Sequence, residues 1–147
     1  MKSLFSQKAY EEIMGRLNNL EESSSPLWGK MNAAQMLYHC QLPLNVILEK
    51  EDYNLKPNFL IKLFFKKSMY NDKLWRKNMP TMPLFRITDL KDFSVEKKAL
   101  AELISELYEQ RGRDHWQPHP SFGKLTKEQW GKMQYKHLDH HFRQFGI

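Results

Sequence analysis

Two histidines near the C-terminus are spaced so that they can share one ligand. His137 and His141 are four residues apart in a segment whose apolar residues recur at helical spacing. On a helix, this spacing places both imidazoles on one face, where their ring nitrogens can bind one divalent ion. Trp130, Leu138 and Phe142 belong to the same stripe, and a buried imidazole is costly without a partner. The spacing therefore indicates either a metal site or a pair of hydrogen-bonded core histidines.

A metal held by two residues of one helix needs a third ligand from a facing element. His39 is the only histidine in the other predicted helices, and it lies beside the apolar stripe of residues 33–49. Three neutral imidazoles leave coordination positions open for water or substrate, as catalytic sites do. This donor set suits zinc, nickel, manganese or iron. The alternative chelating pair is His137 with His140, although His141 fits the apolar stripe better.

The histidine pair lacks the catalytic base of the zinc proteases. Those enzymes carry glutamate directly after the first histidine, and Leu138 occupies that position here. Asp139 is no substitute, because two residues along a helix correspond to about 200° of rotation away from the face of His137. A base must therefore come from elsewhere, or water activated by the metal must suffice.

Three further residues could take part in chemistry. His115 and His119 lie in the loop before the last predicted helix, where His119 is a candidate proton shuttle. The interpretation that we favour is that His119 belongs to a loop-shaping motif, His-Pro-Ser-Phe-Gly. Cys40 follows His39, but it falls on the packing stripe, so we expect a small buried hydrophobic residue.

Four stretches have the apolar spacing and the end signals of helices, namely residues 6–20, 33–49, 94–110 and 126–145. Asn32, Ser94 and Thr126 are the predicted N-caps, and Pro43 predicts a kink or a broken turn. Residues 51–92 contain three prolines and are expected to form a long crossover with one helical piece. The pattern predicts an all-α four-helix bundle in a single domain, residues 1–147.

Composition excludes several classes of protein. With 147 residues, 41% of them hydrophobic and 27% charged, the chain is too apolar to be disordered. No apolar run approaches the ~18 residues that a membrane span needs. The single cysteine cannot form an internal disulfide, and the first residues turn polar before a signal peptide could form. These features predict a cytoplasmic protein.

The net charge of +6 resides in one segment. From Lys56 to Lys77 the chain has seven basic residues and one acidic residue, which accounts for the whole excess. Interleaved aromatic residues suit nucleic acid or an anionic surface. We favour the alternative, in which the aromatics cover the core, the lysine stems extend outward and the charge attracts an anionic substrate. Apolar residues left exposed on the crossover would favour a homodimer.

Two stretches resemble an uncharacterised branch of the DinB/YfiT-like metalloenzyme superfamily. They are WGKMNAAQMLYH at residues 28–39, and HPSFGKLT followed by HLDHHFRQFG within residues 119–146. The likeness covers nearly the full chain. It implies an up-up-down-down four-helix bundle with a long crossover between the second and third helices. It also implies a divalent metal held by His39, His137 and His141, which match the family pattern position by position.

The resemblance also suggests a reaction. Better understood members of the superfamily transfer low-molecular-weight thiols such as bacillithiol, mycothiol or glutathione to electrophiles, and others are isomerases. It therefore implies a metal-dependent transferase that joins a thiol to an electrophilic small molecule, or a hydrolase. The alternatives are a non-catalytic module that binds nucleic acid or an anionic surface through Lys56 to Lys77, and a bundle that has lost its activity.

Overall fold

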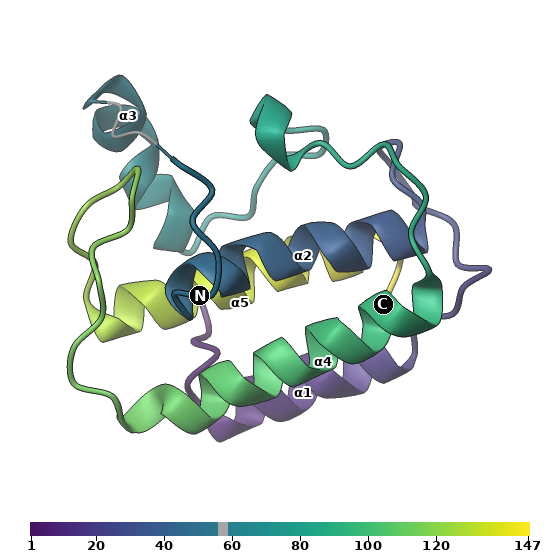
Figure 1. Cartoon of the computed structure of the whole chain (residues 1–147), viewed down its shortest axis with the longest axis horizontal. Helices are drawn as coiled ribbons and strands as arrows, with labels where there is room; N and C mark the ends of the chain where they lie inside the picture. The colour runs from purple at the N-terminus through teal and green to yellow at the C-terminus, as the bar shows by residue number, and fades with distance from the viewer. Residues whose placement is uncertain (56–58) are drawn as a thin grey trace.

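In the computed structural model, which describes residues 1–55 and 59–147, the chain is all-helical and has no strand in these residues (Figure 1). This confirms the predicted all-α class. The five α-helices are α1 (Gln7–Asn18), α2 (Ala33–Ile47), α3 (Phe59–Tyr70), α4 (Phe93–Glu109) and α5 (Lys127–Gln144). Two short 3-10 helices are η1 (Pro83–Phe85) and η2 (Gln110–Gly112). No helix of the described residues is long and apolar enough to cross a membrane.

Reciprocal side-chain caps start the two helices that carry the histidines. At α2, the Asn32 side chain accepts a hydrogen bond from Gln35 N at 2.9 Å, and the Gln35 side chain accepts one from Asn32 N at 3.1 Å. Thr126 caps α5 in the same way. Both predicted caps are confirmed. The helix continues through Pro43, so the broken turn expected there is absent from α2.

The predicted cap of the third long helix is wrong by two residues. Asp92, not Ser94, is the N-cap of α4, and its carboxylate accepts a hydrogen bond from Val95 N at 2.9 Å. A carboxylate satisfies this free N–H and also interacts favourably with the positive end of the helix dipole. Ser94 therefore lies within the first turn.

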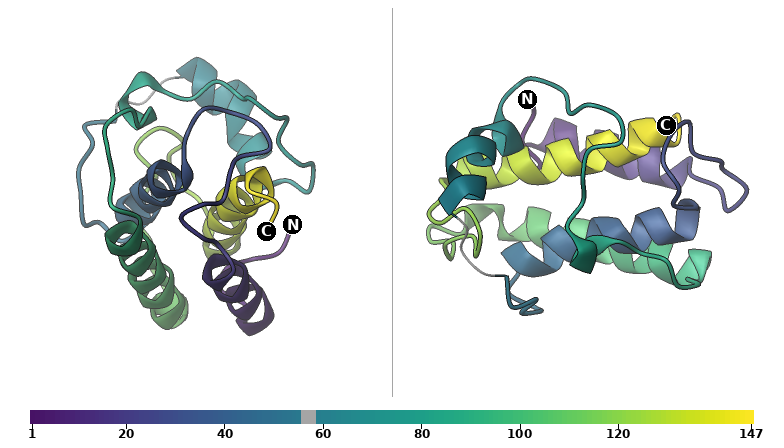
Figure 2. Two further views of the ribbon diagram at one scale, coloured as in Figure 1. Left: turned by 90° about the vertical axis from the view of Figure 1, so that its right-hand side faces the viewer. Right: turned by 90° about the horizontal axis from the view of Figure 1, so that it is seen from above.

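Helices α1, α2, α4 and α5 lie side by side around a shared apolar centre (Figure 2). Helix α2 packs against α4 and α5, and α1 packs against the same two helices. Each helix contributes fully buried side chains, among them Ile13, Leu37, Ile104 and Phe142. The histidine-bearing helices α2 and α5 are therefore direct neighbours.

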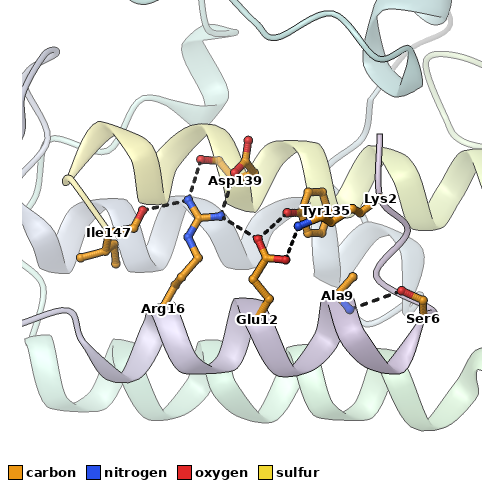
Figure 3. A network of polar contacts seen from close by, with 8 residues as sticks. All are labelled: Lys2, Ser6, Ala9, Glu12, Arg16, Tyr135, Asp139 and Ile147. Carbon is orange, nitrogen blue, oxygen red and sulfur yellow. Dashed lines mark hydrogen bonds and ion pairs between the residues drawn. The ribbon is translucent and has the colours of Figure 1, made fainter.

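A polar network holds α1 parallel to α5 (Figure 3). Arg16 donates a hydrogen bond to Asp139 Oδ1 at 2.7 Å and another to the carbonyl oxygen of Ile147 at 2.8 Å. One turn earlier in each helix, Tyr135 donates to Glu12 at 2.8 Å. Because residue numbers rise together along this network, helices α1 and α5 run in the same direction, and the network sets the register of α5 against α1.

The predicted up-up-down-down order is wrong. Gln41 contacts Glu96, and Lys50 contacts Glu106 further along, so α2 and α4 run parallel to each other. Both run opposite to α1 and α5 (Figure 1). The order along the chain is therefore up, down, down, up. Residues 19–32 reverse the chain direction between α1 and α2, whereas residues 48–92 are long enough to return to the starting end.

In its described residues, the crossover between α2 and α4 contains one α-helix, α3, as predicted, together with the unexpected η1. The favoured interpretation of its aromatic residues is wrong in part. Phe59, Phe64 and Phe65 are exposed, and Tyr70 and Trp75 are partly buried. Helix α3 stands away from the other helices, and the hydrogen bonds that join it to α5 come from its C-terminal end (Figure 1). The first turns of α3 therefore leave their aromatic side chains exposed. Lys56, where the basic segment begins, lies outside the described residues.

A buried lysine fastens α3 to α5. Lys136 is 1% exposed, and its ammonium donates to the carbonyl oxygen of Ser68 at 2.6 Å and to two oxygens of Asn71 at 2.7 and 3.1 Å. Ser68 belongs to the last turn of α3 and Asn71 directly follows the helix, where a cation also interacts favourably with the helix dipole. Lys136 therefore helps to hold the C-terminal end of α3 against α5, while Lys66 of α3 donates separately to the carbonyl oxygen of Lys124.

We expect Lys136→Met to loosen the C-terminal end of α3 and to lower the free energy of unfolding by about 1–3 kcal/mol, because partly buried oxygens of Ser68 and Asn71 lose a charged donor. Amide hydrogen exchange would speed up in α3 while α1 and α4 keep their protection. Lys132→Met is the matched control, since Lys132 lies one turn earlier on α5 and pairs only with the exposed Glu128. Equal exchange in the two variants would contradict the role of Lys136.

Candidate metal centre

The three histidines singled out in the sequence meet between α2 and α5. One ring nitrogen of each of His39, His137 and His141 lies within 4.8 Å of the other two. The Nε2 atoms of His39 and His137 are 3.1 Å apart, and the three ring centroids are separated by 4.6 to 5.0 Å. Among the described residues this is the one cluster of histidine, cysteine or carboxylate side chains with such geometry.

A backbone carbonyl orients the ring of His39. Its Nδ1 lies 3.0 Å from the carbonyl oxygen of Phe85 in η1. A carbonyl oxygen only accepts hydrogen bonds, so Nδ1 carries the proton and Nε2 has a free lone pair. That lone pair is directed at the other two rings. A hydrogen bond of this kind, on the outer nitrogen of the ring, is typical of histidines that bind metals.

A glutamine orients the ring of His141 in the same manner. Nδ1 of His141 lies 2.8 Å from Oε1 of Gln144, whose Nε2 donates to the carbonyl oxygen of Trp28 at 2.6 Å. This second bond fixes which end of the amide is the oxygen, so His141 Nδ1 is the donor. Gly29 makes room for the amide, because a Cβ at this position, where φ is +84°, would collide with Gln144.

Burial keeps the three imidazoles neutral. Desolvation lowers the pKa of His39, and it places the pKa values of His137 and His141 well below their ordinary range, with a further contribution from the neighbouring rings. Neutral imidazole is the form that binds metal ions. The donor set fits such an ion, because tetrahedral Zn–N bonds of about 2.0–2.1 Å separate ligand nitrogens by about 3.3 Å.

Two tryptophans flank His140, and one of them, Trp75, also borders the cluster. The Trp75 ring lies edge-on to His137, with centroids 6.0 Å apart, and to His140, at 5.6 Å. Trp28 lies 5.9 Å from His140 on centroids. His140 is thus flanked by aromatic rings, and its nitrogens do not join the cluster. The structure assembles His137 with His141, and not the alternative pair of His137 with His140.

Asp139 faces away from the cluster, as expected from its position on the helix. Its carboxylate accepts the hydrogen bond from Arg16 of α1. Leu138, at the position where zinc proteases carry glutamate, is buried in the core. Neither residue places a base beside the three imidazoles.

His119 and Cys40 have structural surroundings. Nδ1 of His119 accepts hydrogen bonds from Ser121 N at 3.0 Å and Phe122 N at 3.3 Å, within the turn that closes the bridge from His119 to Gly123. These contacts support the loop-shaping role. Cys40 is fully buried, its Sγ contacts the sulfur of Met36, and burial raises the pKa of its thiol. His115 is exposed in the same loop as His119.

The turn at His119 predicts a loss of stability in acid. Burial, together with nearby Lys66, lowers the pKa of His119 to about 4. The unfolded chain, with an ordinary pKa near 6.5, therefore binds the proton more readily. The neutral His119 side chain therefore makes its full contribution to the free energy of unfolding above about pH 6.5. This contribution is lost as the pH falls towards 4.

In His119→Asn, an amide oxygen replaces Nδ1 as the acceptor without titrating. We expect the stability difference between wild type and variant to change by about 2 kcal/mol between pH 7 and pH 4, in favour of the variant in acid. Urea unfolding across this range measures it. Parallel pH profiles for the two proteins would contradict the assignment.

Sequence reasoning missed the groups that orient the imidazoles. Gln144 is three residues after His141 on the same helix, so helical spacing could have indicated it. The carbonyl of Phe85 has no side-chain signal. Trp75 lies in the basic segment, where nothing in the sequence connects it with α5.

The fold and site together define an all-helical protein with three convergent, neutral histidines of the kind that bind a divalent metal. Over residues 2–146 the chain matches the family described as a protein of unknown function, DUF1569, and it belongs to this family. Comparisons with curated proteins and with solved structures found no match.

Proposed function

We propose that this protein is a divalent-metal-dependent enzyme whose ion is held by His39, His137 and His141. One observation carries the proposal: the outer nitrogens of His39 and His141 are both committed as donors, so their lone pairs point towards a common centre. A core pair of hydrogen-bonded histidines would need only one donor and one acceptor. Nε2 of His137 lies 3.1 Å from Nε2 of His39 and completes the set of three ring nitrogens that an ion would bind.

The architecture that accompanies this proposal is a four-helix bundle of the DinB-like type, formed by α1, α2, α4 and α5. The resemblance supports it through the histidine on α2 and the His-x-x-x-His pair on α5. The crossover contributes Phe85, whose carbonyl orients His39, and Trp75, which borders His137. The long connection thus supplies part of the site.

When bound, a divalent ion would act as a Lewis acid that lowers the pKa of a coordinated thiol or water. The residues of the chain do the remaining work. His39 and His141 are held in the tautomer that binds the ion, while Trp75 borders His137 with apolar surface. We favour transfer of a low-molecular-weight thiol to an electrophile, with hydrolysis as the second reaction of this site.

Elemental analysis of protein purified without a nickel column tests the site. We expect close to one equivalent of a transition metal in the wild type, and a loss in His39→Ala and His137→Ala. Less than a tenth of an equivalent, unchanged by these substitutions, would end the enzyme proposal. Zinc, nickel, manganese and iron are then added back singly to metal-free protein to identify the ion that restores the folded-state stability most.

The reaction is tested with glutathione, cysteine and monochlorobimane as a model electrophile. Thiol transfer predicts bimane conjugation that requires the metal and disappears in His137→Ala, while His115→Ala retains it. Metal-dependent ester hydrolysis without conjugation would assign the hydrolase instead. If fully metallated protein shows neither conjugation nor hydrolysis, both proposed reactions are wrong, although the metal site can still be correct.

A further inference from the structure

The first turns of α3 carry an unusual concentration of exposed apolar side chains. Phe59 is 74% exposed, Phe64 is 68% exposed and Leu63 is 60% exposed. Leu60 and Phe65 are exposed as well. Isolated exposed apolar residues are common on protein surfaces, but five within seven consecutive residues form a patch that calls for a partner.

Basic residues lie beside this patch. They are Lys62 and Lys67 on α3, and Lys73 and Arg76 immediately after it, all exposed. Lys73 and Arg76 line the same depression as Phe64 and Phe65. Within residues 59–147 and 1–55, none of them lies within ion-pair distance of a carboxylate. Asp72, the one acidic residue among them, is paired with the amino group of Met1. We call these four basic and five apolar residues the α3 surface.

We propose that the α3 surface docks the protein on the surface of an anionic phospholipid bilayer. Amphipathic helices that combine Phe and Leu with Lys or Arg lie in the plane of the membrane interface, with apolar side chains among the acyl chains and cations at the phosphates. Helix α3 is about 18 Å long, which suits lying on a membrane and not crossing it. It stands out from the other helices, so it can reach a flat surface before they do (Figure 2).

The charge of the surface disfavours two other occupants. A second copy of the chain would bring two sets of unpaired cations together, which is repulsive. Nucleic acid would satisfy the cations, and its bases could stack on the phenylalanines. However, Leu60 and Leu63 would find no apolar counterpart on a polyanion. A bilayer of anionic lipid supplies both the phosphates and the apolar phase.

Flotation with vesicles tests the proposal on the whole protein. Vesicles of phosphatidylcholine and phosphatidylserine at 7:3 are compared with vesicles of phosphatidylcholine alone, at 0.1 M and 0.5 M salt. We expect at least tenfold stronger partitioning onto the anionic vesicles at low salt, and a marked decrease at high salt. Equal binding to both vesicle types, or none, would overturn the proposal.

Two double variants separate the contributions. Leu63→Ser with Phe64→Ser, and Lys62→Glu with Lys67→Glu, are each expected to reduce partitioning at least tenfold. All four residues are exposed, and circular dichroism checks that the helices persist. The matched charge control is Lys8→Glu with Lys98→Glu, on the exposed sides of α1 and α4, which should bind as the wild type does.

Two further measurements decide between the bilayer and the other occupants. The first is binding of a single-stranded oligonucleotide. If it is tighter than vesicle binding and is unaffected by Leu63→Ser with Phe64→Ser, nucleic acid is the partner and the proposal is overturned. Dimerisation without lipid that this variant abolishes, measured by sedimentation velocity, would show that a second copy covers the α3 surface. A wild-type monomer under these conditions supports the bilayer.

Discussion

Alanine at His39, His137 or His141 is expected to weaken zinc binding by more than about 100-fold. Loss of a group that merely orients a ligand already costs 10–100-fold in affinity, so loss of a ligand itself should cost more. Competition with a chromophoric chelator measures the dissociation constant. The same variants should lose most of the rise in melting temperature that zinc produces in the wild type, because an ion that binds only the folded state stabilises it.

His140→Ala is the matched control for this series, since His140 is adjacent to His141 and its ring nitrogens lie outside the cluster. It should keep zinc affinity within a few-fold of the wild type. An effect of His140→Ala as large as that of His39→Ala would show that the wrong set of imidazoles has been assigned. The control therefore tests the geometry, and not only the presence of histidine on α5.

Gln144→Leu is expected to lower zinc affinity by about 10–100-fold, which corresponds to about 1.4–2.7 kcal/mol. The leucine removes the acceptor that holds the His141 ring in its metal-binding tautomer. It also removes the hydrogen bond to the carbonyl oxygen of Trp28. The affinity of the variant alone would therefore not separate the two contacts.

Gln144→Glu makes the separation. A carboxylate still accepts the proton of His141 Nδ1 but cannot donate to Trp28 when ionised. We expect both variants to lose stability in the metal-free state, while Gln144→Glu keeps near-wild-type zinc affinity. Equal losses of affinity in the two variants would show that the contact with Trp28, and not the orientation of His141, supports the site.

The helices of this protein and part of its site were readable from local patterns. Asn32 with Gln35, and Thr126 with Gln129, are capping pairs whose partners lie three residues apart, so no distant contact is needed to recognise them. The shared face of His137 and His141 follows from the helical repeat in the same way. Asp92 was missed because Ser94 is an equally acceptable cap when only neighbouring residues are considered.

The directions of the helices, the meeting of the three histidines and the exposure of α3 depend on contacts between distant residues. The antiparallel course of α1 and α2 depends on which helices pack together, because the apolar stripes are compatible with either direction. The 3.1 Å approach of His39 to His137 joins residues far apart in the chain, and the carbonyl of Phe85 carries no residue type that could reveal it. The exposure of Phe59 and Phe64 likewise follows from where α3 stands. Helical periodicity shows which side chains share a face of a helix, but only tertiary packing decides whether that face contacts another helix or solvent.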